Sequence, residues 1–470
     1  MRFGLLLLLF LIVSTAQAQQ FSQYNTGTLF DSFEHPAQRA FIPDSSRQFA
    51  FNFFIPNFGG TGTIAGNGQN SIKSYINTGD YNNAGLTNGF QNRSNLSANV
   101  NTYWFMLKMY NRLNSDQEFG ISAQTKAEGR GTITDETMLL LDSYRNFNNG
   151  TNNQDLFNDR TEVQAYHQLS LTFRQKVSSS VTFGVKLSAL FGIYYNKIDI
   201  QNSSFYFNNA NSHATLYLKG TYLSSYAGEY RKRYILGLQN PGAAVSFGLQ
   251  AMLNNGILLQ GNLKDLGFIR WNKSAVTYQF NNSGVIENMT AQGLNDRLIL
   301  TKADSITGHN GSQHAFYSPT DGKAAIDVSK KFNLLTADFY YTPTLIASKN
   351  LFYNGLTAAF VNHFTYKNVW FTALASYNND SAWDGGLQLM YKSPNAEFYV
   401  GTEQLFASAR FINTNNTAAY ASTGMNAYFG FSVKFGRAIK HPANASYIPI
   451  GEPKGFFDKI WRHIFKPAAY

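Results

Sequence analysis

The chain has 470 residues, a formal net charge of +10, 16% aromatic residues, 14% charged residues and no cysteine. The lack of cysteine excludes disulfides, thiolate metal sites and acylation as a lipoprotein. The positive charge is not clustered around a reading element, which excludes a nucleic-acid-binding protein. Many aromatic and few charged residues are typical of membrane β-barrels, in which aromatic side chains gather at both interfaces.

The N-terminus carries the three parts of a secretory signal peptide within residues 1–18. Arg2 is followed by a short apolar core from Leu5 to Val13 and by the small-residue cleavage motif Ala16-Gln17-Ala18. The apolar core is too short to span a membrane, and no later run of about 18 apolar residues could do so. We expect an exported mature chain that begins near Gln19 and has no membrane-spanning helix.

The clearest pattern in the chain is a hairpin over residues 163–193. Its two arms flank Ser178-Ser179-Ser180, and in both arms apolar residues occupy odd positions while polar and basic residues occupy even ones. This alternation gives each strand one apolar and one polar face. Pairing across the serines places Phe173 opposite Val185 and Val177 opposite Val181, so that the apolar faces coincide.

Later hairpins obey the same geometry. A two-residue turn must move the apolar set to the other parity, as it does across Lys367-Asn368 and Pro394-Asn395, and a three-residue turn must keep it, as it does across Asn254-Asn255-Gly256. These tight turns alternate with long polar loops, among them residues 57–95, 128–160, 271–322 and 406–424. Short turns at one end and long loops at the other predict an all-β fold, a transmembrane antiparallel β-barrel of about 14 (14–16) strands over residues 48–436.

Several polar residues are candidates for a site. Five basic residues belong to the lumen-facing sets and either select an anion or are simply solvated: Lys108, Arg174, Lys176, Lys186 and Lys434. Asp265 is expected to have a structural role, capping a turn or accepting hydrogen bonds from backbone amides. His309 and His314 lie in a polar loop without a helical His-x-x-x-His or a Gly-x-Ser-x-Gly turn, so we predict no catalytic site, no metal site and no cofactor.

The C-terminal residues 437–470 follow the last predicted strand. Three prolines predict an extended linker, and apolar residues then recur at helical spacing over residues 454–466, opposite a basic face. We expect a periplasmic linker and a short amphipathic helix. The helix either binds a membrane surface or an envelope protein, or packs under the barrel mouth.

Two short motifs accompany the strand pattern: GNLKDLGFIRW at residues 261–271 and DSFEHPAQRAFIPDSS at residues 31–46. With the alternating strands they resemble an uncharacterised family of exported barrels from Bacteroidota. That family is similar in layout to FadL-like long-chain fatty acid transporters and to PorV and PorP/SprF-type proteins. The resemblance implies an outer-membrane barrel whose N-terminal segment, residues 19–47, lies inside as a plug. His35 stands before Pro36-Ala37 where the relatives have asparagine.

Two functional hypotheses follow. The first is FadL-like binding or passage of a small hydrophobic or amphipathic molecule, with outer-membrane lipid around the barrel, an apolar pocket in the lumen beneath the plug and a lateral opening at a kinked strand. The alternative is a non-transporting accessory component of a cell-envelope secretion or motility machine. That role predicts a filled lumen and docking to an envelope protein through residues 454–466.

Overall fold

The computed structural model describes residues 20–42, 45–111, 116–208, 210, 212–226, 238–288, 295–308, 311–334, 338–379, 382–413 and 422–439. The predicted signal peptide and the predicted helix at residues 454–466 lie outside these residues. Within them, no helix has the length and apolar character needed to cross a lipid bilayer.

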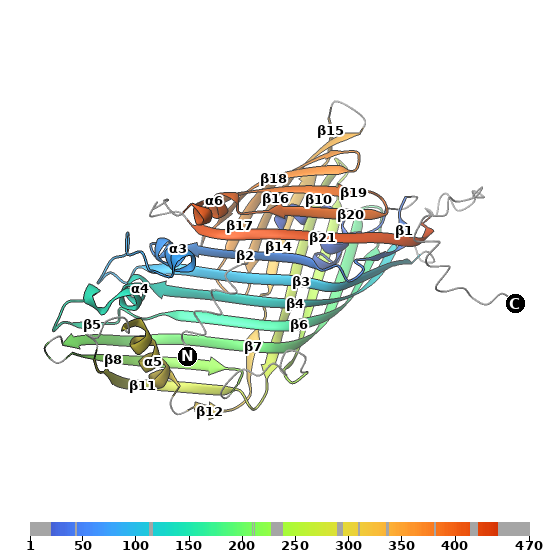
Figure 1. Cartoon of the computed structure of the whole chain (residues 1–470). Coiled ribbons are helices and arrows are strands. Elements are labelled where there is room, and N and C mark those ends of the chain that lie inside the picture. The colour runs from blue at the N-terminus through green and yellow to red at the C-terminus, as the bar shows by residue number, and fades with distance from the viewer. Residues whose placement is uncertain are drawn as a thin grey trace, which may run out of the picture.

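Antiparallel strands close into a 14-strand barrel (Figure 1). The ring closes where β2 pairs with both β3 and β21. The strands are β1 (Arg47–Phe51), β2 (Asn57–Ala65), β3 (Arg93–Asn111), β4 (Gln117–Thr134), β5 (Asn152–Gln154), β6 (Arg160–Lys176), β7 (Val181–Asn208), β8 (His213–Ser224), β9 (Pro241–Met252), β10 (Ile257–Trp271), β11 (Val276–Ile286), β12 (Gly311–Gln313), β13 (Phe316–Pro319), β14 (Lys323–Lys330), β15 (Phe332–Asn333), β16 (Phe339–Asn350), β17 (Leu356–Tyr366), β18 (Val369–Asn378), β19 (Ala382–Lys392), β20 (Ala396–Thr402) and β21 (Thr423–Ala438).

Some positions in the ring are filled by interrupted strands. β1 and β2 together pair with β3 on one side and β21 on the other. The 28-residue β7 pairs with β8 along its second half and with β9 along its first half, so β8 and β9 are two parts of one strand position. β11 likewise continues the course of β10, because β11 pairs with β8 while β10 pairs with β9.

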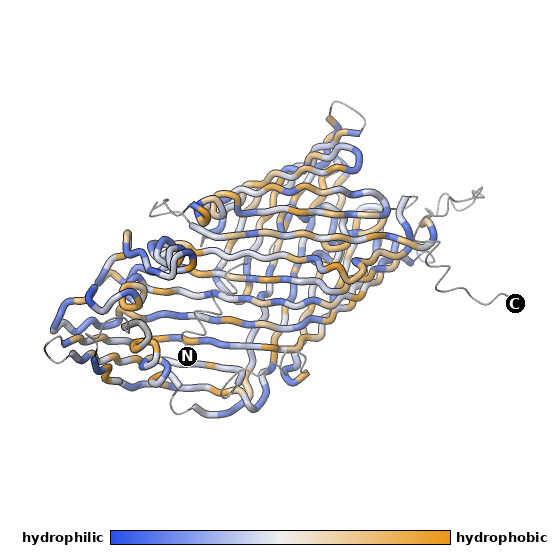
Figure 2. The backbone as a smooth tube through the Cα atoms, viewed as in Figure 1, coloured by the Kyte–Doolittle hydropathy of each residue, from blue (hydrophilic) through white to orange (hydrophobic). Residues whose placement is uncertain are grey.

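The predicted hairpin registers are confirmed. Phe173 lies opposite Val185, and the Val177 amide donates to the Val181 carbonyl oxygen at 2.9 Å. The hairpins around residues 367–368 and 394–395 place Phe364 opposite Phe371 and Leu389 opposite Val400. Along these strands apolar side chains point outward and polar ones inward, and Figure 2 shows the resulting alternation along the tube. The transmembrane barrel fold is therefore confirmed.

Three expected loops contain regular structure instead. Residues 57–65 form β2, residues 128–134 extend β4, and the span 271–322 holds β11 and α5 (Asn295–Thr307). Glycine, threonine and charged residues hide the alternation in these strands, because their outward faces are covered by protein or their inward faces carry charge. Polar composition alone was a poor guide to loops here.

One side of the barrel is much taller than the other. β3, β4 and β6 have 19, 18 and 17 residues, whereas about 9–11 residues suffice to span a membrane. β17, β18 and β19 have 11, 10 and 11. The tall side also carries α3 (Gln69–Thr78), α4 (Asp135–Asp142), η2 (Tyr144–Asn146) and α5, and α6 (Leu405–Ile412) lies beside the same end of β21 (Figure 1). Thus the strands continue beyond the spanning length and are covered by helices there.

The N-terminal segment lies inside the barrel at the opposite end. It contains η1 (Phe21–Gln23) and α2 (Leu29–Glu34), which begins at the N-cap Thr28. Leu29, Phe33 and Ala37 are fully buried, and the segment bonds to strands on several sides of the lumen. Residues 20–42 therefore fill this part of the lumen, and we call them the plug.

Candidate functional site

The plug rests on three inward-facing glycines from neighbouring parts of the wall. A Cβ at Gly184 would lie 2.1 Å from the Pro36 carbonyl oxygen, and one at Gly248 would lie 2.7 Å from the Ala37 nitrogen. A Cβ at Gly120 would lie 2.9 Å from the Phe33 ring. The wall can approach the plug this closely because these positions have no side chain.

Polar contacts hold the plug in this seat. The Glu34 carboxylate pairs with Lys264 and accepts a hydrogen bond from the Tyr103 hydroxyl at 2.6 Å. Arg174 Nε donates to the Ala37 carbonyl oxygen at 3.0 Å, and Lys108 Nζ donates to the Ser32 carbonyl oxygen at 3.1 Å. Burial raises the pKa of Glu34, but the nearby lysine ammonium groups outweigh it and lower the pKa to about 2. Glu34 is therefore ionised and fixes the plug electrostatically.

His35 is buried in the plug beside Gly248. Within the described residues, neither ring nitrogen has a hydrogen-bond partner. Burial, with a smaller effect of the Lys108 charge, lowers the pKa of His35 to about 4. The ring is therefore neutral at pH 7, and Glu34, not His35, makes the polar contacts that hold this part of the plug.

Four of the five predicted lumen-facing basic residues are buried and paired with carboxylates. Lys108 Nζ lies 3.3 Å from Glu118, Arg174 lies 2.8 Å from Asp116, Lys186 lies 3.0 Å from Asp265, and Lys434 lies 3.5 Å from Glu397. These four have little capacity left for a free anion. The fifth, Lys176, is exposed at the last residue of β6, because the wall ends there.

Asp265 is the centre of the buried charge network. It has a φ of +49° at an irregularity in the β9–β10 pairing, and its carboxylate pairs with Lys126 and Lys186. It also accepts hydrogen bonds from Gln168 at 3.0 Å and Ser246 at 3.3 Å. These partners are side chains of β4, β6, β7 and β9, not backbone amides after the strand as expected, so Asp265 links β10 to four other strands.

The tall wall has a polar and an apolar face. On β3, Asn99 bonds across the lumen to Asp321 and Tyr103 bonds to the plug, so odd positions in this part of the strand face inward. Leu96 and Ala98 at even positions therefore face outward. On β7, Lys197 pairs with lumenal Glu162, which leaves Ile198 on the outer face.

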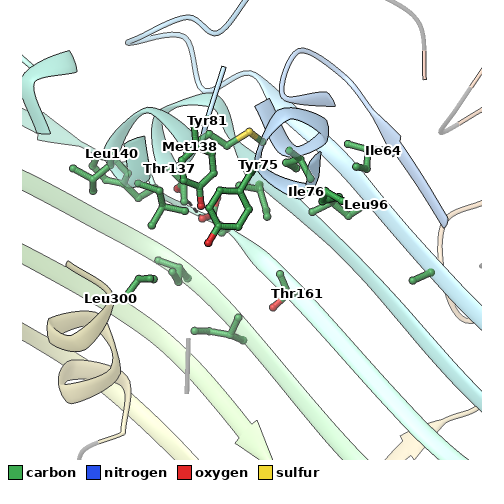
Figure 3. A pocket seen from close by; sticks show the side chains of 18 of the residues that line it. Ile64, Tyr75, Ile76, Tyr81, Leu96, Thr137, Met138, Leu140, Thr161 and Leu300 are labelled. Carbon is green, nitrogen blue, oxygen red and sulfur yellow. Dashed lines mark hydrogen bonds between the residues drawn. The ribbon is translucent and has the colours of Figure 1, made fainter. Parts of the chain in front are cut away.

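An apolar cavity of about 150 Å³ lies on this outer face, between the wall and helices α3, α4, α5 and α6. Figure 3 shows side chains from the helices and from the strands converging on it. Residues that line it include Ile64, Ile72, Tyr75, Leu96, Met138, Leu140, Ile198, Leu216, Leu300, Ala303, Phe411 and Met425. Its acid, Asp159, accepts hydrogen bonds from the Thr134 amide at 2.8 Å and the Thr137 hydroxyl at 2.7 Å, so the protein itself satisfies this carboxylate.

The position of this cavity differs from the expected one. No plug residue lines it, and it lies outside the lumen. The lining residues on α3, α4, α5 and α6 were missed because these helices lie within expected loops. One signal was available: Thr134 followed by Asp135, Glu136 and four apolar residues is typical of a helix start, and Thr134 does cap α4.

A polar chamber of about 740 Å³ lies on the other side of the same wall. Thr63, Leu96, Ser97 and Ala98 border both cavities, because they belong to the strands that separate them. The chamber is lined by charged and amide side chains, including Asn95, Arg93, Glu128, Arg130, Arg160, Glu162, Asp321, Lys323 and Asn350. Among the described residues, no group of three or more His, Asp or Glu side chains could hold a metal ion.

The fold and the plug define a transmembrane β-barrel closed at one end by its own N-terminal segment. The chain belongs to DUF5723, a family of unknown function whose model matches residues 40–403. No curated protein matches the sequence. Solved structures similar to it include the Pseudomonas putida toluene transporter TodX, at 9% identity and a TM-score of 0.42 over 87% of this chain and 94% of that chain. Another is a Pseudomonas aeruginosa FadL homologue, at 13% identity and a TM-score of 0.44 over 88% and 96%.

Proposed function

We propose that this protein is an exported outer-membrane barrel that binds a small hydrophobic or amphipathic molecule in the apolar cavity on its outer face. The observation that carries the proposal is the cavity itself: a lining of mostly aliphatic and aromatic side chains that leaves about 150 Å³ unfilled. Cores normally pack without such voids, because an apolar void forfeits contacts. An apolar cavity of this size stays dry and accepts a molecule about as large as benzene.

A membrane location is supported by the exterior of the spanning strands. Leu171, Leu187 and Ile121 are among the large apolar side chains that are half exposed or more on the wall, at 60%, 58% and 50%. A contiguous apolar surface of this kind is stable in lipid and a liability in water. The signal peptide at residues 1–18 is part of the same proposal, because only an exported chain reaches the outer membrane.

The ligand exchanges with the membrane and not through the lumen. Phe411 of α6 and Met425 of β21 line the cavity, while Phe406 and Ile412 of α6 are exposed beside it. These side chains make an apolar path between the cavity and the lipid-facing surface. The lumen offers no such path, because the wall separates it from the cavity and the chamber on its lumenal side is polar.

A cavity-filling variant tests this proposal. Ala303→Phe places a ring in the cavity, and the matched Asn95→Phe places the same ring in the polar chamber. In lipid nanodiscs, saturable binding of fluorobenzene is followed by ¹⁹F NMR. We expect Asn95→Phe to bind like the native chain and Ala303→Phe to bind at least about tenfold more weakly. Equal binding by both variants, with both barrels folded, would contradict the proposal.

The accessory role stays a prediction. That role predicts a filled lumen, and the plug fills the lumen at one end only. The helix that it predicts as the docking element, residues 454–466, lies outside the described residues. Deleting residues 454–466 separates the two ideas. Loss of a co-purifying envelope protein with fluorobenzene binding intact would favour the accessory role. The lateral opening and the likeness to PorV and PorP/SprF-type proteins also stay predictions.

A further inference from the structure

Within the polar chamber, three arginines come from adjacent strands. Arg93 lies on β3, Arg130 on β4 and Arg160 on β6, and all three line the chamber. The register brings them together: Thr132 of β4 pairs with Arg160, and Arg93 pairs with Thr134, two residues further along the same strand. Arg130 precedes Thr132 by two residues and faces the same side.

The chamber's acids are already engaged by the protein. Glu162 pairs with Lys197 at 3.4 Å and accepts hydrogen bonds from the hydroxyls of Tyr195 and Tyr353 at 3.3 and 3.2 Å. Asp321 pairs with Lys323 at 2.9 Å. Glu128 accepts from the Tyr166 hydroxyl at 2.8 Å and lies 3.6 Å from Arg130. These acids have local partners and do not neutralise the other two arginines.

Arg93 and Arg160 differ from the buried basic residues of the plug region. Both are exposed at the chamber, and no carboxylate lies within 4 Å of either one in the part of the chain that the structure describes; the Asp159 carboxylate interacts with the Arg93 charge over a longer distance. Arg130 is on the strand between theirs, two residues before the partner of Arg160 on β4, and its guanidinium carbon lies 3.0 Å from the centre of the Tyr353 ring. Three guanidinium groups on adjacent strands, one of them positioned by an aromatic ring, suit the oxygens of phosphate, sulfonate or carboxylate groups.

We propose that the lumenal chamber is a second site, independent of the apolar cavity, that binds a water-soluble anion bearing two or more phosphate or carboxylate groups. Arg93, Arg160 and Arg130 follow one another along the direction of β4 and together bind the charged groups of the anion. The volume of about 740 Å³ accommodates a solute of that size with its hydration water. The plug closes the lumen behind it, so the anion enters and leaves by the end that carries the helices.

The test is calorimetric titration of inorganic pyrophosphate into the full mature chain, in nanodiscs of zwitterionic lipid at low ionic strength. The native chain is expected to bind saturably, with an affinity that falls as salt is added. Arg93→Gln/Arg160→Gln is expected to bind at least about tenfold more weakly, since each lost guanidinium removes charge-assisted hydrogen bonds. Ala303→Phe, which alters the apolar cavity alone, is expected to bind like the native chain.

Lys176→Gln is the matched control, because it removes one charge from the exposed rim of the barrel. Should it weaken binding as much as Arg160→Gln does, net charge and not the chamber would explain the result, and the proposal would fail. Absence of saturable binding to the native chain would overturn it too. If the double variant does not fold, Arg160→Gln and Arg160→Lys decide: the lysine variant is expected to bind better than the glutamine variant.

Discussion

At the scale of single residues, the strongest dependence is on Asp265. Its carboxylate compensates the buried ammonium groups of Lys126 and Lys186. Asp265→Asn would leave both cations without their partner, which costs about 3–5 kcal/mol in a buried site. We expect this loss in urea unfolding of the barrel. Asp116→Asn is the control: that carboxylate is partly exposed, so its pair with Arg174 should contribute about 1 kcal/mol or less. Equal losses would show that burial does not set the cost.

His35 predicts a pH dependence at the same scale. In the plug its pKa is about 4, against an ordinary value of 6.5, so the unfolded chain takes up a proton first as the pH falls. His35 therefore lowers stability between pH 6.5 and pH 4, by up to about 3 kcal/mol. Asp31 acts in the opposite direction, because burial raises its pKa to about 7.

The contribution of His35 to this pH dependence is isolated by comparing the native chain with His35→Asn, since Asp31 is present in both. The difference in unfolding free energy between variant and native chain should grow in favour of the variant from pH 6.5 to pH 4. It should be constant above pH 7.5. Parallel stability curves over the whole range would mean that His35 is not desolvated in the plug.

At the scale of elements, the plug and its glycine seat form one unit. Gly184→Val would place a side chain where the Pro36 carbonyl lies, so the plug must leave its seat. The chain has no cysteine, so Ser32→Cys provides a single buried thiol to report on this. We expect maleimide labelling to be about tenfold faster or more in the Gly184→Val background. Gly261→Val is the control, because nothing lies within 4 Å of its added Cβ, and it should label like the parent.

Elements with a strict period of two were predictable, and elements covered by other parts of the protein were not. The 163–193 hairpin has one face in lipid and one in the lumen, so its sequence fixes its register. In β8 and β11, packed under α4 and α5, the outward face is core, and residues such as Phe280 and Leu216 are buried. The helices within the expected loops were not predicted, because a helix as short as the eight-residue α4 gives only a weak periodic signal in the sequence.

The residue types of the two cavities were predictable from the sequence, but their positions in the barrel were not. Apolar lining and arginines on strands are both visible in the sequence, yet which side of the wall they occupy depends on two irregularities. The pairing shifts between Tyr103 and Phe105 on β3 and next to Ala165 and Tyr166 of β6. The first shift exchanges the inward and outward parity along β3, which is why Arg93 was missed, and the second places the extra residue Ile193 on β7. Arg130 and Arg160 keep the inward parity of β4 and β6 and were missed because residues 128–160 were expected to form a loop.

At the scale of the whole molecule, one wall of the barrel separates an apolar cavity on its outer face from a polar chamber in the lumen. Its outer face, once beyond the bilayer, is covered by helices and holds an apolar void, while its inner face holds arginines and water-exposed amides. Such a division requires strands that are taller than the membrane on one side of the ring. The lower, shorter side has no equivalent cover in the described residues, so lipid must reach its exterior directly.

Depth in the membrane provides the last prediction. Leu171 and Val177 are both outward-facing and exposed, at 60% and 64%, but Leu171 lies within β6 and Val177 lies at the tight turn. An arginine in the middle of the lipid band costs about 2–4 kcal/mol, whereas near the interface it costs about 0–1 kcal/mol. Leu171→Arg should therefore destabilise the barrel far more than Val177→Arg in guanidinium unfolding from phospholipid vesicles. If both variants lost the same small amount, water and not lipid would surround residues 163–193, and the membrane assignment would be wrong.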